Sequence, residues 1–149
     1  MPEQERFSLS EHIGLIREVL ESGGQFTLFP RGTSMLPLIV EGRDSVTLTA
    51  SDSYCCGDIA FYQRTDGSFI LHRIVGEKDG AFVMCGDNQL QREYGISPVQ
   101  IIGKADSLTR KGTKISCGCL SYRLYCLMWR SFFLRRVYFR LRRIFHGSK

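Results

Sequence analysis

Two Asp-Gly turns in the middle of the chain most constrain its fold. They stand in Thr65-Asp66-Gly67 and Lys78-Asp79-Gly80, and a short apolar run lies on each side of both. Asp-Gly between apolar runs is a strong hairpin signal, because glycine adopts the positive φ that tight hairpin turns require. A further strand is expected over residues 99–103. The pattern predicts a mainly antiparallel β domain over residues 25–106, with His72 on the middle strand of a meander.

An amphipathic helix is expected before the β domain, over residues 8–22. Ser8 and Glu11 have the spacing of a capping box, and Gly23-Gly24 stops the helix. The helix is too short and too charged to span a bilayer, so residues 1–24 are predicted to be a short helical segment. Its apolar face is formed by Leu9, Ile13, Ile16 and Leu20.

The segment Pro30-Arg31-Gly32-Thr33-Ser34-Met35-Leu36-Pro37 lies between two short β-type runs. Its glycine permits backbone angles that other residues avoid, and its last proline stiffens the exit. This arrangement suits a serine held in a fixed position with its hydroxyl facing a groove. For the segment by itself, a loop that is merely bounded by prolines is the simpler alternative.

Three further blocks follow in order, and they favour a functional serine over a simple loop. They are Gly57-Asp58-Ile59-Ala60-Phe61-Tyr62, Leu71-His72-Arg73-Ile74-Val75-Gly76 and Cys85-Gly86-Asp87-Asn88. Together with the serine segment, these blocks resemble the type I signal peptidase superfamily, which also contains the self-cleaving SOS repressors. Four blocks in order are far more specific than any one of them. The resemblance covers roughly residues 25–106 and implies a half-open antiparallel β domain.

The resemblance also implies roles for two residues. Ser34, directly before a methionine, corresponds to the nucleophile, and His72, directly before an Arg-hydrophobic pair, corresponds to the general base. Most bacterial signal peptidases carry lysine at this second position, whereas the endoplasmic-reticulum, archaeal and sporulation-type enzymes carry histidine. A neutral imidazole takes a proton from a hydroxyl near pH 7. We therefore expect a serine endopeptidase of the Ser-His branch that cleaves peptide or leader-peptide substrates and needs no cofactor.

A carboxylate is expected to orient the imidazole, and two candidates remain open. Asp87 occupies the position of the family's most recurrent acid in this block, and we favour it narrowly as the third catalytic residue. Glu93 is the rival, because the His-branch enzymes often carry an acid several residues beyond Gly-Asp-Asn. Taken singly, His72 is more often a packing residue and Asp87 a turn residue.

The resemblance places the backbone N–H of Ser34 in the oxyanion hole. Many bacterial relatives add a serine hydroxyl two residues before the nucleophile, where this chain has Gly32. Backbone donors or the Thr33 hydroxyl would have to replace that group. Asp58 and Asn88 resemble family residues that shape turns around the site.

Cysteine use and the first residues indicate a reducing compartment. Residues 1–6 are polar and acidic, which predicts no secretory signal. Reduced thiols in the cytoplasm are therefore expected rather than a disulfide framework. Cys117-Gly118-Cys119 lacks a second ligand pair at usable spacing, so we expect no metal site. The six cysteines are Cys55, Cys56, Cys85, Cys117, Cys119 and Cys126.

Charge divides the chain into an acidic β domain and a basic tail. Residues 1–106 hold 9 Lys and Arg against 15 Asp and Glu, whereas residues 107–149 hold 11 basic residues and no acid. We expect a polar linker over residues 107–119 and a basic amphipathic helix within the tail, residues 120–149. Its apolar face comprises Leu134, Val137, Tyr138, Leu141 and Phe145, and its opposite face Arg135, Arg136, Arg140, Arg142 and Arg143.

Two roles of the tail remain open at this point. Residues 120–146 are predicted either to bind an anionic membrane surface or to pack their apolar face on the β domain with the arginines in water. The first role would place the protein on the inner face of the membrane and the second in the cytoplasm. Nucleic acid is not an expected partner, because a regular apolar stripe does not serve it.

Two other functional classes compete with a peptidase. A repressor-like regulator needs a helix-turn-helix before the peptidase fold, and about 24 residues with one helix cannot build it. A catalytically inactive peptide-binding or membrane-surface adaptor with the same fold remains the main alternative.

Overall fold

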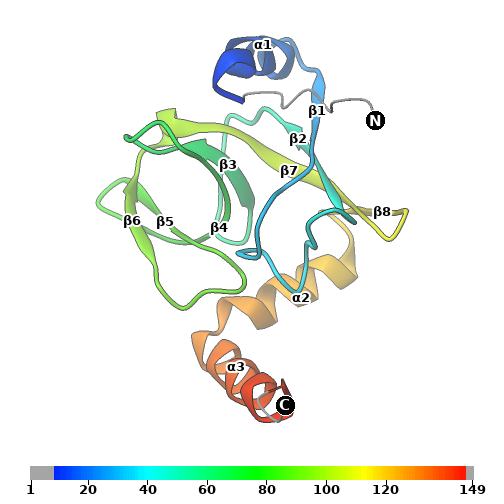
Figure 1. Ribbon diagram of the computed structural model, residues 1–149. Helices are drawn as coiled ribbons and strands as arrows, with labels where there is room; N and C mark the ends of the chain where they lie inside the picture. Colours follow the sequence, from blue (N-terminus) through cyan, green and yellow to red (C-terminus); the bar gives the residue numbers. More distant parts are fainter. Residues whose placement is uncertain (1–8, 147–149) are drawn as a thin grey trace.

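The computed structural model describes residues 9–146 (Figure 1). Three α-helices and one 3-10 helix accompany eight strands of a single sheet. The helices are α1 (Leu9–Glu21), α2 (Leu120–Arg130), α3 (Phe132–His146) and the 3-10 helix η1 (Pro98–Gln100). The strands are β1 (Gln25–Leu28), β2 (Ser45–Thr49), β3 (Ile59–Gln63), β4 (Phe69–Lys78), β5 (Ala81–Cys85), β6 (Glu93–Ile96), β7 (Ile101–Arg110) and β8 (Thr113–Ser116).

Every strand pairing in the sheet is antiparallel, as the turn signals predicted. The spatial order is β1-β2-β7-β3-β4-β5-β6, and β8 pairs with β7 outside this path. Both Asp-Gly hairpins are present, because β3 pairs with β4 and β4 with β5. Figure 1 shows β3 to β6 curving around one side of the molecule and β1, β2, β7 and β8 forming the other. The prediction of a mainly antiparallel β domain is confirmed.

The central strand β3 separates two hydrophobic cores. Its residues Ile59 and Phe61 face the core that α1, β2 and β7 share, and Ala60 and Tyr62 face a second core against β4 and β5. Successive side chains of a strand point to opposite faces of the sheet. A strand buried on both faces is therefore apolar at every position, as residues 59–62 are.

The N-terminal helix α1 covers one end of the sheet, and its apolar face enters the first core. Ile16 and Leu20 are buried there, and Leu9 and Ile13 pack at its edge. Gly23 has φ +84°, the left-handed conformation that ends helices. The expected cap residue Ser8 lies outside the described residues.

The segment expected to be a linker, residues 107–119, is largely regular structure, which corrects the prediction. Strand β7 continues to Arg110, and β8 pairs back onto it from Ser116 to Thr113. The turn between them is Lys111-Gly112, and both of its residues have positive φ. Such a pair favours a tight hairpin rather than an open linker.

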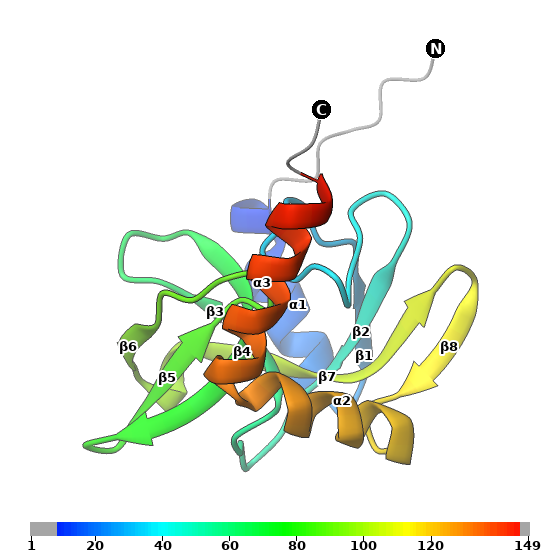
Figure 2. The same cartoon turned by 90° about the horizontal axis from the view of Figure 1, so that it is seen from below.

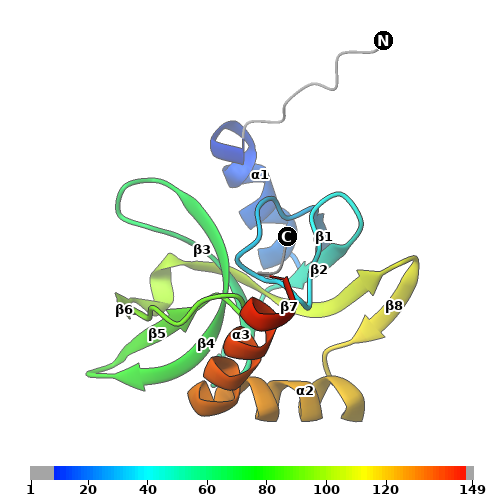
Figure 3. The same cartoon turned by 60° about the horizontal axis from the view of Figure 1, so that its bottom comes forward.

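The two C-terminal helices pack against the sheet end that α1 does not cover. Helix α2 lies along β7 and β8, and α3 leaves it at a steep angle and runs towards the loop after β1 (Figures 2 and 3). Tyr122, Cys126 and Trp129 form the buried face of α2. Within the described residues, no helix is long and apolar enough to cross a membrane.

Candidate active site

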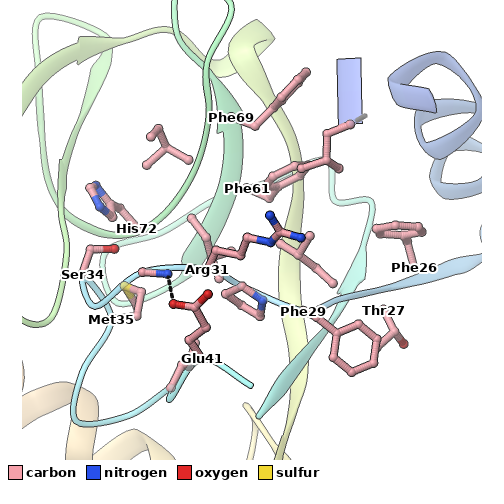
Figure 4. Close-up of a pocket in the computed structure, with 17 residues that line it drawn as sticks. Phe26, Thr27, Phe29, Arg31, Ser34, Met35, Glu41, Phe61, Phe69 and His72 are labelled. Atoms are coloured by element: carbon pink, nitrogen blue, oxygen red, sulfur yellow. Dashed lines mark hydrogen bonds between the residues drawn. The ribbon is translucent and has the colours of Figure 1, made fainter. Parts of the chain in front are cut away.

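A pocket of about 1000 Å³ opens between β1, the serine segment and the first half of β4. Ser34 and His72 lie at the same end of it (Figure 4). The rest of the lining is mostly apolar, with one acid and one base at the rim, Glu41 and Arg31. The apolar walls come from Phe26, Leu28, Phe61, Phe69 and Leu71.

A hydrogen bond to a side chain and a buried methionine fix the serine segment. The Gly32 N–H donates to the Glu41 carboxylate at 2.8 Å, shown as the dashed line in Figure 4. The side chain of Met35 is buried in the first core and so fixes the position of the segment. Ser34 is half-exposed towards the pocket. The segment therefore presents one hydroxyl on a braced backbone.

The Cys85-Gly86-Asp87-Asn88 block braces the same segment from the other side. The Asn88 N–H donates to the Ser34 carbonyl oxygen at 2.8 Å. A Cβ added at Gly86 would stand 2.6 Å from that carbonyl oxygen, closer than real Cβ atoms approach. Glycine is thus required at this position so that the block can approach the serine. The glycine of the Gly86-Asp87-Asn88 motif is therefore explained by its close approach to the Ser34 backbone.

His72 lies on β4 with its ring almost entirely shielded, since the residue is 6% exposed. Burial lowers the pKa of its imidazole to about 4; the charge of Glu93 opposes this shift and that of Arg64 adds to it. A histidine in such surroundings is neutral at pH 7. It therefore carries a free lone pair, which a general base requires.

A phenol lies beside the Nδ1 atom of His72. The Tyr62 hydroxyl lies 3.5 Å from Nδ1 and donates to the Glu93 carboxylate at 2.7 Å. Arg64 binds both oxygens of that carboxylate, at 2.7 and 2.8 Å. The hydrogen bond from Arg64 lowers the pKa of Glu93, so this acid is ionised at neutral pH. The carboxylate holds the phenol proton, so the phenol oxygen can accept from Nδ1 in the tautomer that carries the imidazole proton there.

The Asp87 carboxylate is not bound to His72; its partner is the guanidinium of Arg73. Its two oxygens accept from Arg73 Nε at 2.8 Å and Arg73 Nη2 at 2.7 Å, and both residues are fully buried. The Tyr125 hydroxyl adds a third bond to the carboxylate at 3.0 Å. Among the hydrogen bonds of the described residues, none joins this carboxylate to His72. The geometry therefore makes Asp87 the centre of a buried ion pair.

The tail contributes most of the remaining contacts of this ion pair. The Trp129 indole N–H donates to the Asp87 carbonyl oxygen at 2.7 Å. Arg135 is fully buried; its guanidinium donates to the carbonyl oxygens of Gly86 and Gln89 and reaches within 3.8 Å of the Asp87 carboxylate. This corrects the prediction that Arg135 lies on a solvent-facing side of the tail helix.

Three functional candidates of this site were missed in the sequence. Tyr62 belongs to an apolar run that reads as core, Arg64 to a turn, and Arg135 to a group of arginines of which only one is buried. Their positions follow from contacts across 10 to 50 residues of sequence. The one local signal was the lone hydroxyl at the end of the apolar run 59–62.

No family model, curated protein or solved structure matches this chain. Among the described residues, no group of His, Cys, Asp and Glu side chains gathers in a way that could hold a metal ion.

Proposed function

We propose that this protein is a serine endopeptidase of the signal-peptidase type, with Ser34 as nucleophile and His72 as general base. One observation carries the proposal: a half-exposed serine on a braced loop and a buried histidine of low pKa share one end of a pocket of about 1000 Å³. The order of the four sequence blocks supports the same assignment independently.

In the proposed reaction, neutral His72 takes the proton of the Ser34 hydroxyl as its oxygen attacks the carbonyl carbon of the scissile peptide bond. The imidazolium then gives that proton to the leaving amine as the bond to nitrogen breaks. Water, deprotonated by the same imidazole, hydrolyses the resulting ester and restores both residues. The low pKa of His72 favours the return of its proton in each half of the cycle.

The Tyr62–Glu93 pair would take the orienting role that a carboxylate has in other triads. With its proton held by Glu93, the phenol oxygen accepts from Nδ1–H of His72, which leaves the lone pair on Nε2. The 3.5 Å separation is long, and such bonds often tighten only in the complex with substrate. Glu93, rather than Asp87, would then stabilise the imidazolium through the phenol.

The backbone N–H of Ser34 would serve as an oxyanion donor. Among the described residues it has no hydrogen-bond acceptor, so it is available to a ligand. Gly32 N–H is already bound to Glu41, which removes it as a second donor. The Thr33 hydroxyl remains the candidate for that second donor.

The pocket suits a peptide in extended conformation. Within the described residues, β1 pairs with β2 alone, and residues 69–72 of β4 pair with β3 on one edge only. Both strands border the pocket. An extended peptide can add to a free strand edge through main-chain hydrogen bonds while pockets select its side chains. The phenylalanines and leucines of the walls favour apolar side chains next to the cleaved bond.

Cleavage of a peptide library derived from a digested proteome tests the proposal. Wild-type protein should generate new N-termini that share a sequence preference, with apolar residues before the cut. Ser34→Ala should generate none, and its unfolding midpoint should match that of wild type. Equal cleavage by wild type and Ser34→Ala would refute the proposal.

A second candidate is a peptide-binding protein without hydrolysis. Its support is that no hydrogen bond joins the Ser34 hydroxyl to the His72 ring among the described residues. In this case the library would yield no cleavage, and peptides with the same apolar preference would be retained by the immobilised protein.

A further inference from the structure

The tail carries an exposed apolar surface that its packing on the β domain leaves uncovered. Of the fifteen large hydrophobic residues that are exposed in the described chain, ten belong to α2 and α3. We call these ten residues the tail surface: Leu120, Leu124, Leu127, Met128, Phe133, Leu134, Val137, Leu141, Ile144 and Phe145. Val137, Leu141 and Ile144 recur at helical spacing and therefore share one face of α3. Large apolar patches are rare on the surface of monomeric proteins and mark interaction sites.

Helix α3 is divided lengthwise into three faces. Its inner face contacts the β domain through Arg135 and Arg142, the latter donating to the Asn88 side chain at 3.2 Å. Its apolar face includes Val137 and Ile144, which belong to the tail surface. Between these two faces runs an exposed cationic stripe: Arg136, Arg140 and Arg143. Helix α2 repeats the pattern with exposed leucines and with the exposed arginines Arg123 and Arg130.

Charge decides which partner this surface fits. Residues 120–146 contain seven arginines and no acid. A surface that combines leucine, isoleucine and phenylalanine with arginines matches the headgroup region of an anionic bilayer, where apolar side chains enter the acyl boundary and guanidinium groups bind phosphates. The helices are too short to cross that bilayer, so they would lie in its plane.

We propose that the tail surface binds the face of an anionic lipid bilayer. Self-association is disfavoured, because two copies would bring their arginine stripes together. Nucleic acid would use the arginines and leave ten apolar side chains in water. The proposal resolves the two roles that the sequence left open: the tail both packs on the β domain and keeps its apolar face outside.

The position of the tail surface also relates it to the serine segment. A shallow groove of about 430 Å³ separates the C-terminal half of α3 from the turn that follows Ser34. This groove is lined by Leu36, Pro37, Val40, Tyr138, Leu141, Arg142 and Phe145. A bilayer bound by the tail surface would therefore lie beside the loop that carries Ser34.

Cosedimentation with lipid vesicles tests the proposal. The full chain should pellet with phosphatidylcholine vesicles that contain one third phosphatidylserine, and should stay in solution with phosphatidylcholine alone. High salt should release only part of it, since the apolar contacts are not screened. Ser34→Ala should bind like wild type, so a failure here is distinct from a failure of the proposed peptidase activity.

Two pairs of variants separate the charged and apolar contributions. The double variant Arg136→Gln with Arg140→Gln should weaken vesicle binding roughly 30-fold. Its control, Lys78→Gln with Lys114→Gln, removes the same charge from the β domain and should change vesicle binding less than about twofold. Ile144→Ser with Phe145→Ser should weaken binding at least about 100-fold and abolish the salt-resistant fraction. The last pair is 67% and 78% exposed, so the fold should persist, and Val99→Ser, at 80% exposure, is its control.

Three results would overturn the proposal. The first is a full-length chain that ignores anionic vesicles at low salt. The second is binding that the arginine and apolar variants leave unchanged. The third is a wild-type dimer, seen by sedimentation, that Ile144→Ser with Phe145→Ser converts to monomer, because the tail surface would then serve a second copy of the chain.

Discussion

Replacing Asp87 by asparagine should lower the free energy of unfolding of this protein, although the two side chains have the same shape. The change removes one charge from a fully buried ion pair with Arg73. Burial acts to lower the pKa of Arg73, but the Asp87 carboxylate outweighs burial and holds this pKa well above its usual value. The variant loses this support, but an arginine side chain remains protonated in proteins, so the guanidinium stays charged in the variant. It also faces an amide that offers one acceptor in place of two.

The magnitude follows from the burial of both partners. Removing one member of a buried pair leaves an uncompensated charge, at a cost of about 3–5 kcal/mol. Asparagine keeps one acceptor for Arg73 or Tyr125, so we expect about 3 kcal/mol. The free energy of unfolding of a domain is only about 5–15 kcal/mol, so the loss is a large fraction of it. With a urea dependence of roughly 2 kcal/mol per molar, the midpoint should fall by about 1.5 M.

Trp129 provides the assay. It is the only tryptophan of the sequence, and its indole N–H donates to the Asp87 carbonyl oxygen. Its fluorescence therefore reports the contact between the tail and this block directly. Urea titrations of wild type and Asp87→Asn should give transitions of similar slope and separated midpoints.

Asp106→Asn is the matched control, because its carboxylate is exposed on β7. Its free energy of unfolding should match that of wild type within about 0.5 kcal/mol. If Asp87→Asn unfolds at the wild-type midpoint, Asp87 is not the centre of a stabilising ion pair. Its carboxylate would then again be a candidate for orienting His72.

Further predictions concern the site itself. Gly86→Ala should cost about 1–3 kcal/mol of stability and displace Ser34. Gly76→Ala should be nearly neutral, because its added Cβ would meet its nearest atom at 3.9 Å. Thermal unfolding of the two variants measures the difference. The rate of reaction at Ser34 should rise with pH through the His72 pKa of about 4 and stay constant near neutrality. Because this pKa lies below the unfolded value, folding should also lose roughly 3 kcal/mol as pH falls from about 6.5 to about 4, measured by urea titration in that range. Glu93→Gln should slow the reaction at least about tenfold and shift its pH profile further down, since the Glu93 charge raises the His72 pKa; an unchanged profile would exclude Glu93 from the orienting role.

The β meander could be predicted because its signals are local. The Asp66-Gly67 and Asp79-Gly80 turns and the apolar runs beside them determine β3, β4 and β5 with little help from distant contacts. The β7–β8 hairpin has a comparable signal in Lys111-Gly112, but the residues beside this turn, 107–110 and 113–116, are mostly polar. The sequence therefore predicts a linker there.

The sequence left Glu93 open as a candidate, but it could not predict the contact through Tyr62 or the burial of Arg135, because these depend on contacts that sequence spacing does not encode. Glu93 reaches His72 only through Tyr62, 31 residues earlier in the chain. Arg135 looks like the other arginines of its helix, and only the carbonyl oxygens of a loop 46 to 49 residues away make its burial favourable. The order of the four blocks points to Ser34 and His72, whereas the proposed orienting group depends on contacts between distant strands.

Labelling by a serine-reactive fluorophosphonate tests the central claim most directly. We predict that the wild-type protein is labelled at pH 7 and that peptide mapping places the adduct on Ser34. Ser34→Ala and His72→Ala should both be unlabelled while keeping cooperative unfolding transitions. Labelling of Ser34→Ala at the wild-type rate, or of His72→Ala at an undiminished rate, would contradict the assignment of this pair as nucleophile and base.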